Sequence, residues 1–116
     1  MYSLTSANRY YLYLGFVRMN LGIDGLFKII RSQMKELSPI SGDVFLFFGK
    51  NRQSVKILRW DGDGFLLYYK RLEGGRFELP TFNPHTGNDE ISYQVLSFIL
   101  NGVSLKSVRL RKRFRI

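Results

Sequence analysis

The sequence predicts an α+β protein, in which an antiparallel β-meander of four to five strands carries two helices on one face and a basic tail follows. Three observations support this fold class. Short apolar and aromatic runs alternate with glycine turns between residues 44 and 80. Apolar residues recur at helical spacing in two other stretches, residues 22–37 and 90–100. The 116 residues suit one domain, which we place at residues 1–105, with the tail at residues 106–116.

A strand and an amphipathic helix are expected first. Residues 9–14, with the sequence RYYLYL, are short and rich in aromatic side chains, as strands often are. In residues 22–37 the apolar positions follow the i, i+3, i+4, i+7 pattern of one helix face. Asn20 is the expected N-cap, and Asp24 lies in the first turn, where the helix dipole favours a carboxylate. Pro39 follows the end of this helix.

The meander comes next. Its strands are expected at residues 44–48, 55–60, 65–72 and 76–79. The first of them, VFLFF, is too short for a helix and is typical of a buried strand. Two glycine turns separate the later strands: DGDG at residues 61–64, where Asp-Gly tolerates the positive φ of a tight hairpin, and EGGR at residues 73–76. Pro80, which has no N–H to donate to a ladder, ends the last strand.

A loop and a second helix complete the domain. Residues 81–88 contain proline, glycine and asparagine and are expected to form the loop. Asp89 is the expected N-cap of a helix over residues 90–100, because its carboxylate can accept from the free N–H groups of a first turn. Gly102 is expected to be the C-terminal cap of this helix, because a glycine in the left-handed conformation commonly ends a helix.

The positive charge is concentrated at the end of the chain. The net charge is +9, of which residues 1–105 carry +3 and the last eleven residues carry +6, since no acidic residue occurs there. Such a charge predicts a polyanionic partner, above all DNA, although a solvated basic terminus has the same composition. The tail cations are Lys106, Arg109, Arg111, Lys112, Arg113 and Arg115. The meander contains a second group among its aromatic residues, and we predict nucleic-acid binding at both groups: Lys56, Arg59, Lys70 and Arg71.

No pattern for catalysis or for cofactor or metal binding is legible. The chain has no cysteine, and His85 is its only histidine, so the common thiolate and imidazole sites lack ligands. Asp61 and Asp63 lack the further ligands of a calcium loop. Together with Glu73 at another hairpin end, they are the carboxylates on which a metal-dependent nuclease would depend. No leader peptide and no apolar run of about 20 residues is visible, so we expect a cytoplasmic protein without a membrane segment.

Four segments of the chain resemble a known family. They are GIDGL at residues 22–26, FLF at residues 45–47, KILRWDGDGF at residues 56–65 and KRLEGGRF at residues 70–77. Together they are similar to the TnpB-type, Orf2-like accessory proteins of the IS66 group of bacterial insertion sequences, which are distinct from the RNA-guided nucleases that share the TnpB name. The resemblance extends over roughly residues 9–112 and implies a role in transposition beside a separate transposase that carries the catalytic acids.

Three hypotheses follow for the function. The first is a non-catalytic accessory protein of transposition that binds DNA, or the complex of DNA with the transposase of the same element. The second is a protein-interaction module that docks on the transposase without touching DNA. The third is a metal-dependent nuclease that uses Asp61, Asp63 and Glu73. A homo-oligomer is compatible with each of them.

Overall fold

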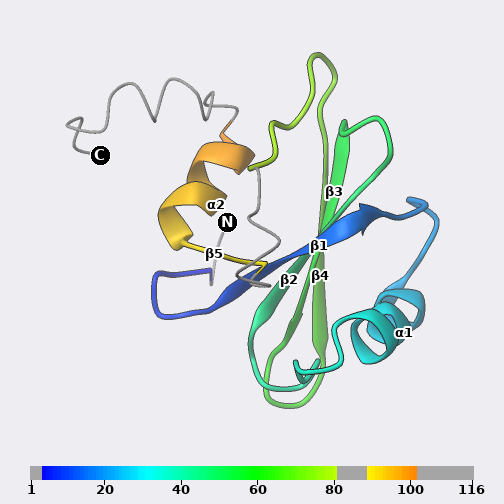
Figure 1. Ribbon diagram of the computed structural model, residues 1–116, viewed down its shortest axis with the longest axis vertical. Coiled ribbons are helices and arrows are strands. Elements are labelled where there is room, and N and C mark those ends of the chain that lie inside the picture. Colours follow the sequence, from blue (N-terminus) through cyan, green and yellow to red (C-terminus); the bar gives the residue numbers. More distant parts are fainter. Residues whose placement is uncertain (1–3, 81–88, 102–116) are drawn as a thin grey trace.

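A single mixed β-sheet organises the computed structural model, which describes residues 4–80 and 89–101. Its strands lie in the order β4-β3-β2-β1-β5 (Figure 1). The elements along the chain are β1 Tyr10–Phe16, α1 Ile23–Gln33, β2 Val44–Phe48, β3 Ser54–Trp60, β4 Phe65–Arg71, β5 Glu90–Ile91 and α2 Tyr93–Leu100. The predicted α+β class is confirmed, and β2, β3 and β4 form the predicted antiparallel meander.

The pairing of β1 with β2 corrects the prediction of a wholly antiparallel sheet. These two strands run parallel, with Tyr10 opposite Val44 and Leu12 opposite Leu46. The reason is the connection between them: α1 carries the chain back along the sheet, so that β2 starts at the same end as β1. The short strand β5 then pairs antiparallel with the beginning of β1, where Tyr10 lies opposite Ile91.

The two helices cover opposite faces of the sheet, and not one common face as predicted (Figure 1). Successive side chains of a strand point to opposite faces. Phe45 and Phe47 of β2 therefore pack in the core under α1, whereas Leu46 and Phe48 pack in the core under α2. All five residues of β2 are buried, as expected for a strand covered on both faces. The helices contribute Leu26, Ile30, Leu96 and Ile99 to these two cores.

Helix α1 begins later than predicted. Its N-cap is Gly22, without a side-chain hydrogen bond, and not Asn20. Asn20 belongs to a preceding turn in which the Leu21 N–H donates to the carbonyl of Arg18 at 3.1 Å. Asp24 lies in the first turn of α1, as predicted. The first turn of α1 therefore has a favourable charge but no side-chain hydrogen bond from its N-cap residue.

The predicted helix over residues 90–100 also starts too early, with the wrong cap. Residues 90 and 91 form β5, because Ile91 is buried in the α2-side core and the carbonyl of Asp89 accepts from the Leu12 N–H at 3.0 Å. The N-cap of α2 is Ser92, whose hydroxyl oxygen accepts from the Val95 N–H at 3.1 Å. Asp89 therefore takes part in pairing with β1 and does not cap a helix.

The segment after β4 is an extended chain without the strand predicted at residues 76–79. Phe77 is nevertheless buried: its N–H donates to the carbonyl of Arg52 at 2.7 Å, and its ring meets that of Phe48 edge-on. The predicted hairpin at residues 61–64 is confirmed by the positive φ of Gly62, +83°. Residues 81–88, the Gly102 cap and the proposed boundary between residues 105 and 106 lie outside the described residues. In the part of the chain that is described, neither helix is long or apolar enough to reach across a bilayer.

Candidate nucleic-acid interface

Lys56, on the α1 side of β3, is tied into the fold. Its ammonium donates a hydrogen bond of 2.6 Å to the carbonyl oxygen of Leu21, in the segment that leads into α1. The same Nζ lies 5.5 Å from the centre of the Tyr69 ring on the neighbouring strand. The hydrogen bond and the contact with the aromatic ring both stabilise the charged ammonium. Lys56 therefore links the segment before α1 to strand β3.

Lys70 lies on the opposite side of the sheet, facing α2. Its ammonium donates to the carbonyl oxygen of Leu100 at 2.8 Å. The last carbonyls of a helix have no partner within the helix, and the negative end of the helix dipole attracts a cation. Lys70 thus closes the C-terminal end of α2, although it remains exposed to solvent.

Arg59 lies on the α2 side as well and is half-buried, opposite Val44 in the ladder. Its charge acts on Tyr10. Burial raises the pKa of Tyr10 to about 12, and Tyr93 adds to the rise, whereas Arg59 and the hydrogen bond to the Thr5 carbonyl oppose it. The Tyr10 hydroxyl donates that bond at 2.6 Å. Arg59 is therefore part of a polar environment around a core tyrosine.

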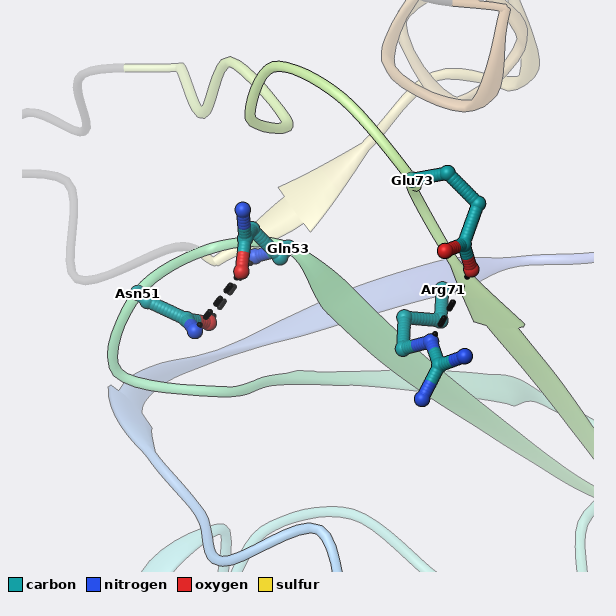
Figure 2. Close-up of polar contacts among 4 residues, drawn as sticks. All are labelled: Asn51, Gln53, Arg71 and Glu73. Carbon is teal, nitrogen blue, oxygen red and sulfur yellow. Dashed lines mark hydrogen bonds and ion pairs between the residues drawn. The ribbon is translucent and has the colours of Figure 1, made fainter.

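Arg71 ends β4 on the α1 side and forms an ion pair with Glu73, with 3.1 Å between Nε and Oε2 (Figure 2). Both side chains are largely exposed, 63% and 80%, so solvent screens the pair and a phosphate can replace the carboxylate. At the same end of the sheet the Asn51 amide donates to the Gln53 side-chain oxygen at 3.0 Å (Figure 2). Arg71 is thus an exposed cation whose ion-pair partner is also exposed.

The structure therefore does not gather the four meander cations on one surface. Lys56 and Arg71 lie on the α1 side of the sheet, and Arg59 and Lys70 lie on the α2 side, as their spacing along the strands implies. Their predicted contact with nucleic acid stays a prediction. The six cations predicted in residues 106–115 lie outside the described residues.

The three carboxylates of the nuclease hypothesis do not come together. Asp61 and Asp63 lie in the turn between β3 and β4, whereas Glu73 follows the far end of β4. The seven residues of β4 separate them by roughly 20 Å at a rise of about 3.3 Å per residue. Two catalytic metals need acids around sites about 4 Å apart. Among residues 4–80 and 89–101 no cluster of three or more metal-binding side chains exists. His85 lies outside these residues.

Sequence reasoning missed an apolar groove at the carboxyl ends of β1 and β2. The groove has a volume of about 720 Å³ and is lined by Phe16, Val17, Arg18, Met19, Gly49, Lys50 and Asn51. Two of these side chains, Arg18 and Lys50, are exposed cations. No local motif indicates this site, because it exists only where two strands distant in sequence pair in parallel.

Fold and surface together define a small α+β protein with cations dispersed over both sides of one sheet and an apolar groove at the carboxyl ends of two of its strands. The chain belongs to a family described as IS66 Orf2 like protein, whose model matches residues 8–110. The resemblance found in the sequence is thereby confirmed, and the family associates the chain with transposition as an accessory protein.

Two relatives come from Sinorhizobium fredii (strain NBRC 101917 / NGR234), and both are described as uncharacterized proteins. The chain is 33% identical to y4hO over 95 residues, which cover 82% of the chain and 80% of y4hO. It is 31% identical to y4jC over 91 residues, 76% of the chain and 77% of y4jC. No solved structure matches the chain.

Proposed function

We propose that the protein is a non-catalytic accessory factor of insertion-sequence transposition that binds DNA, alone or in complex with the transposase, through its C-terminal cations. The observation that carries this proposal is the distribution of charge: the last eleven residues hold six cations and no acid. Phosphate neutralisation by lysine and arginine supplies most of the affinity of sequence-independent DNA binding. Membership in the transposition-associated family makes DNA the relevant polyanion.

The geometry of the body supports this assignment to the tail. Lys56 and Lys70 each donate to a backbone carbonyl within the fold, so moving either ammonium to a phosphate costs an existing hydrogen bond. Arg71 can exchange its exposed carboxylate partner for a phosphate at little cost. The body therefore offers scattered secondary contacts, and the concentrated charge of residues 106–115 dominates the electrostatic attraction.

The test is fluorescence anisotropy of the full chain with labelled duplex DNA from the ends of its insertion sequence, over a series of salt concentrations. Six phosphate contacts predict a slope of about −5 for log affinity against log salt. A variant with all six tail cations replaced by glutamine should lose most of this slope. The control is Lys28→Gln with Lys35→Gln, which replaces one exposed cation on α1 and one just after its end and should change little. An unchanged slope in the tail variant, or no binding at low salt, refutes the proposal.

A second candidate, docking on the transposase without DNA contact, is favoured by one observation. Leu14 and Phe16, near the end of β1, are 61% and 51% exposed. Neighbouring exposed apolar side chains of this size often mark a protein contact. The two candidates differ in salt dependence, since apolar docking survives high salt and nuclease treatment whereas phosphate contacts weaken. Co-purification of the two tagged proteins with and without nuclease separates them.

A further inference from the structure

Among the described residues, only the first half of the outer edge of β1 is paired. Strand β5 pairs with Tyr10 and Tyr11, and the Leu12 N–H reaches the carbonyl of Asp89. Within residues 4–80 and 89–101, no strand pairs with the outer edge of β1 beyond that point. An open strand edge presents unpaired N–H and C=O groups that an extended chain can join. Residues 13–16 are therefore an open strand edge among the described residues.

A bulge interrupts the regular pairing of β1 along this stretch. Between Leu12 and Phe16 the strand advances four residues, while its partner β2 advances only from Leu46 to Phe48. Bulges bend a strand and re-aim its side chains. The Tyr13 ring packs over Gly15 so closely that a Cβ there would lie 2.8 Å from the tyrosine hydroxyl. Leu14 and Phe16, on either side of Gly15, are exposed on the side of the sheet that α2 covers elsewhere.

The groove begins where this edge ends. Phe16, Val17 and Met19 form its apolar wall, and the exposed cations Arg18 and Lys50 belong to its lining. The lining contains no carboxylate that could neutralise them. A ligand for this surface must offer apolar side chains together with negative charge.

We propose that the edge of β1 and the adjoining groove bind an extended segment of another protein, with apolar residues at its centre and carboxylates at its ends. The segment adds a strand to β1 at residues 13–16, which gives main-chain hydrogen bonds, while its apolar side chains pack on Leu14 and Phe16. Its carboxylates meet Arg18 and Lys50, which matches the charge of the groove. This inference goes beyond the proposed DNA binding and does not depend on the tail.

Two other occupants fit less well. Antiparallel pairing with a second copy of this chain would set the start of one β1 beside the end of the other. That arrangement brings the exposed Arg9 of one copy near Arg18 of the other and repels. A nucleic acid would satisfy the cations but has no alternating N–H and C=O groups for the strand edge, and its phosphates would not cover Phe16.

The experiment is a ¹H–¹⁵N NMR titration of the full chain with three synthetic peptides. The first has a valine–isoleucine–valine centre between glutamates, the second replaces the glutamates by lysines, and the third replaces the apolar centre by serines. We expect amide shifts in residues 12–19 and 49–51 with the first peptide and markedly weaker binding of the other two. Duplex DNA and a single-stranded oligonucleotide are titrated as competing probes.

Two variants test the chemistry of the site. Phe16→Ser should weaken binding of the first peptide about fivefold, because the half-exposed ring loses its contact area. Arg18→Glu with Lys50→Glu should weaken it about tenfold and reverse the preference toward the lysine peptide. The first matched control is Ile40→Ser, because Ile40 is 55% exposed away from the groove. The second is Lys28→Glu with Lys35→Glu, in α1 and just after its end, and both controls should bind as the natural chain does.

The proposal is overturned by any of four results. Amide shifts confined to residues outside 12–19 and 49–51 would refute it, as would a peptide preference that stays the same after the charge reversal of Arg18 and Lys50. Oligonucleotides that shift residues 12–19 more strongly than the peptides would assign the groove to nucleic acid. A dimer in analytical ultracentrifugation that Phe16→Ser abolishes would assign the edge to a second copy of this chain. Failure of DNA binding by the tail leaves all these readouts unaffected.

Discussion

Lys56 is a predicted DNA contact, but in the structure it stabilises the fold. Replacing Lys56 with methionine tests which of these two roles the side chain has. Methionine keeps the apolar stem of the side chain but removes the ammonium, which donates at 2.6 Å to the Leu21 carbonyl and lies over the Tyr69 ring. A hydrogen bond from a charged group contributes about 1.5–3 kcal/mol, and the half-buried position of Lys56 places it at the lower end. The ring contact adds about 0.5 kcal/mol.

We therefore expect Lys56→Met to lower the free energy of unfolding by about 2 kcal/mol, which corresponds to a fall in Tm of about 10 °C. Urea unfolding followed by circular dichroism measures the change, with Lys28→Met as the control for loss of an exposed cation. The same samples are tested for DNA affinity, where the slope against salt should stay as it is. If Lys56→Met is as stable as the control and binds DNA more weakly, Lys56 is a binding residue and the structural reasoning is wrong.

Three further predictions concern the fold around the candidate surfaces. The raised pKa of Tyr10, about 12 against an unfolded value of 10.0, favours the neutral phenol in the folded state. The stability that Tyr10 contributes is therefore fully present below about pH 10 and is lost as the pH rises toward 12, so the free energy of unfolding should fall by about 2–3 kcal/mol over this range. Urea unfolding at several pH values measures this fall, and Tyr10→Phe should remove it. Ser92→Ala removes the N-cap of α2 and should cost about 1 kcal/mol, whereas Ser32→Ala inside α1 should cost little, as measured by thermal unfolding. Gly62→Ala forces a Cβ onto a φ of +83° and should cost about 1 kcal/mol, whereas Gly64→Ala, in open space without a positive φ, should be neutral in the same assay.

The elements that the sequence predicted well are those with a strong local signal. The apolar spacing of α1 and the Asp-Gly turn at residues 61–64 depend on interactions within a few residues, and both are found in the structure. The helix caps were predicted less well, because Asn20 and Asp89 are suitable residue types whose backbones are used elsewhere. The carbonyl of Asp89 accepts from Leu12 of β1, a contact that no local pattern reveals.

The candidate DNA contacts were predictable as charges but not as positions. The alternation of side chains along a strand correctly indicated that Lys56 and Arg59 point to opposite sides. It did not indicate that Lys56 meets the Leu21 carbonyl or that Lys70 meets the Leu100 carbonyl, since both contacts join residues about thirty positions apart. Tertiary contacts of this kind decide whether a lysine is available for a phosphate.

The parallel pairing of β1 with β2 explains both the main error of the sequence prediction and the existence of the groove. In an antiparallel pair the end of β1 would lie beside the start of β2, and Phe16 would meet Val44. Because the strands run parallel, Phe16 lies opposite Phe48, and the residues that follow each strand meet at the same end of the sheet. Two signals pointed to this arrangement: a helix long enough for a crossover separates the strands, and VFLFF is apolar at every position, as in a strand covered on both faces. The same connection that places α1 opposite α2 thus brings Arg18 and Lys50 to one groove, so the proposed docking site is a consequence of the topology and not of any motif.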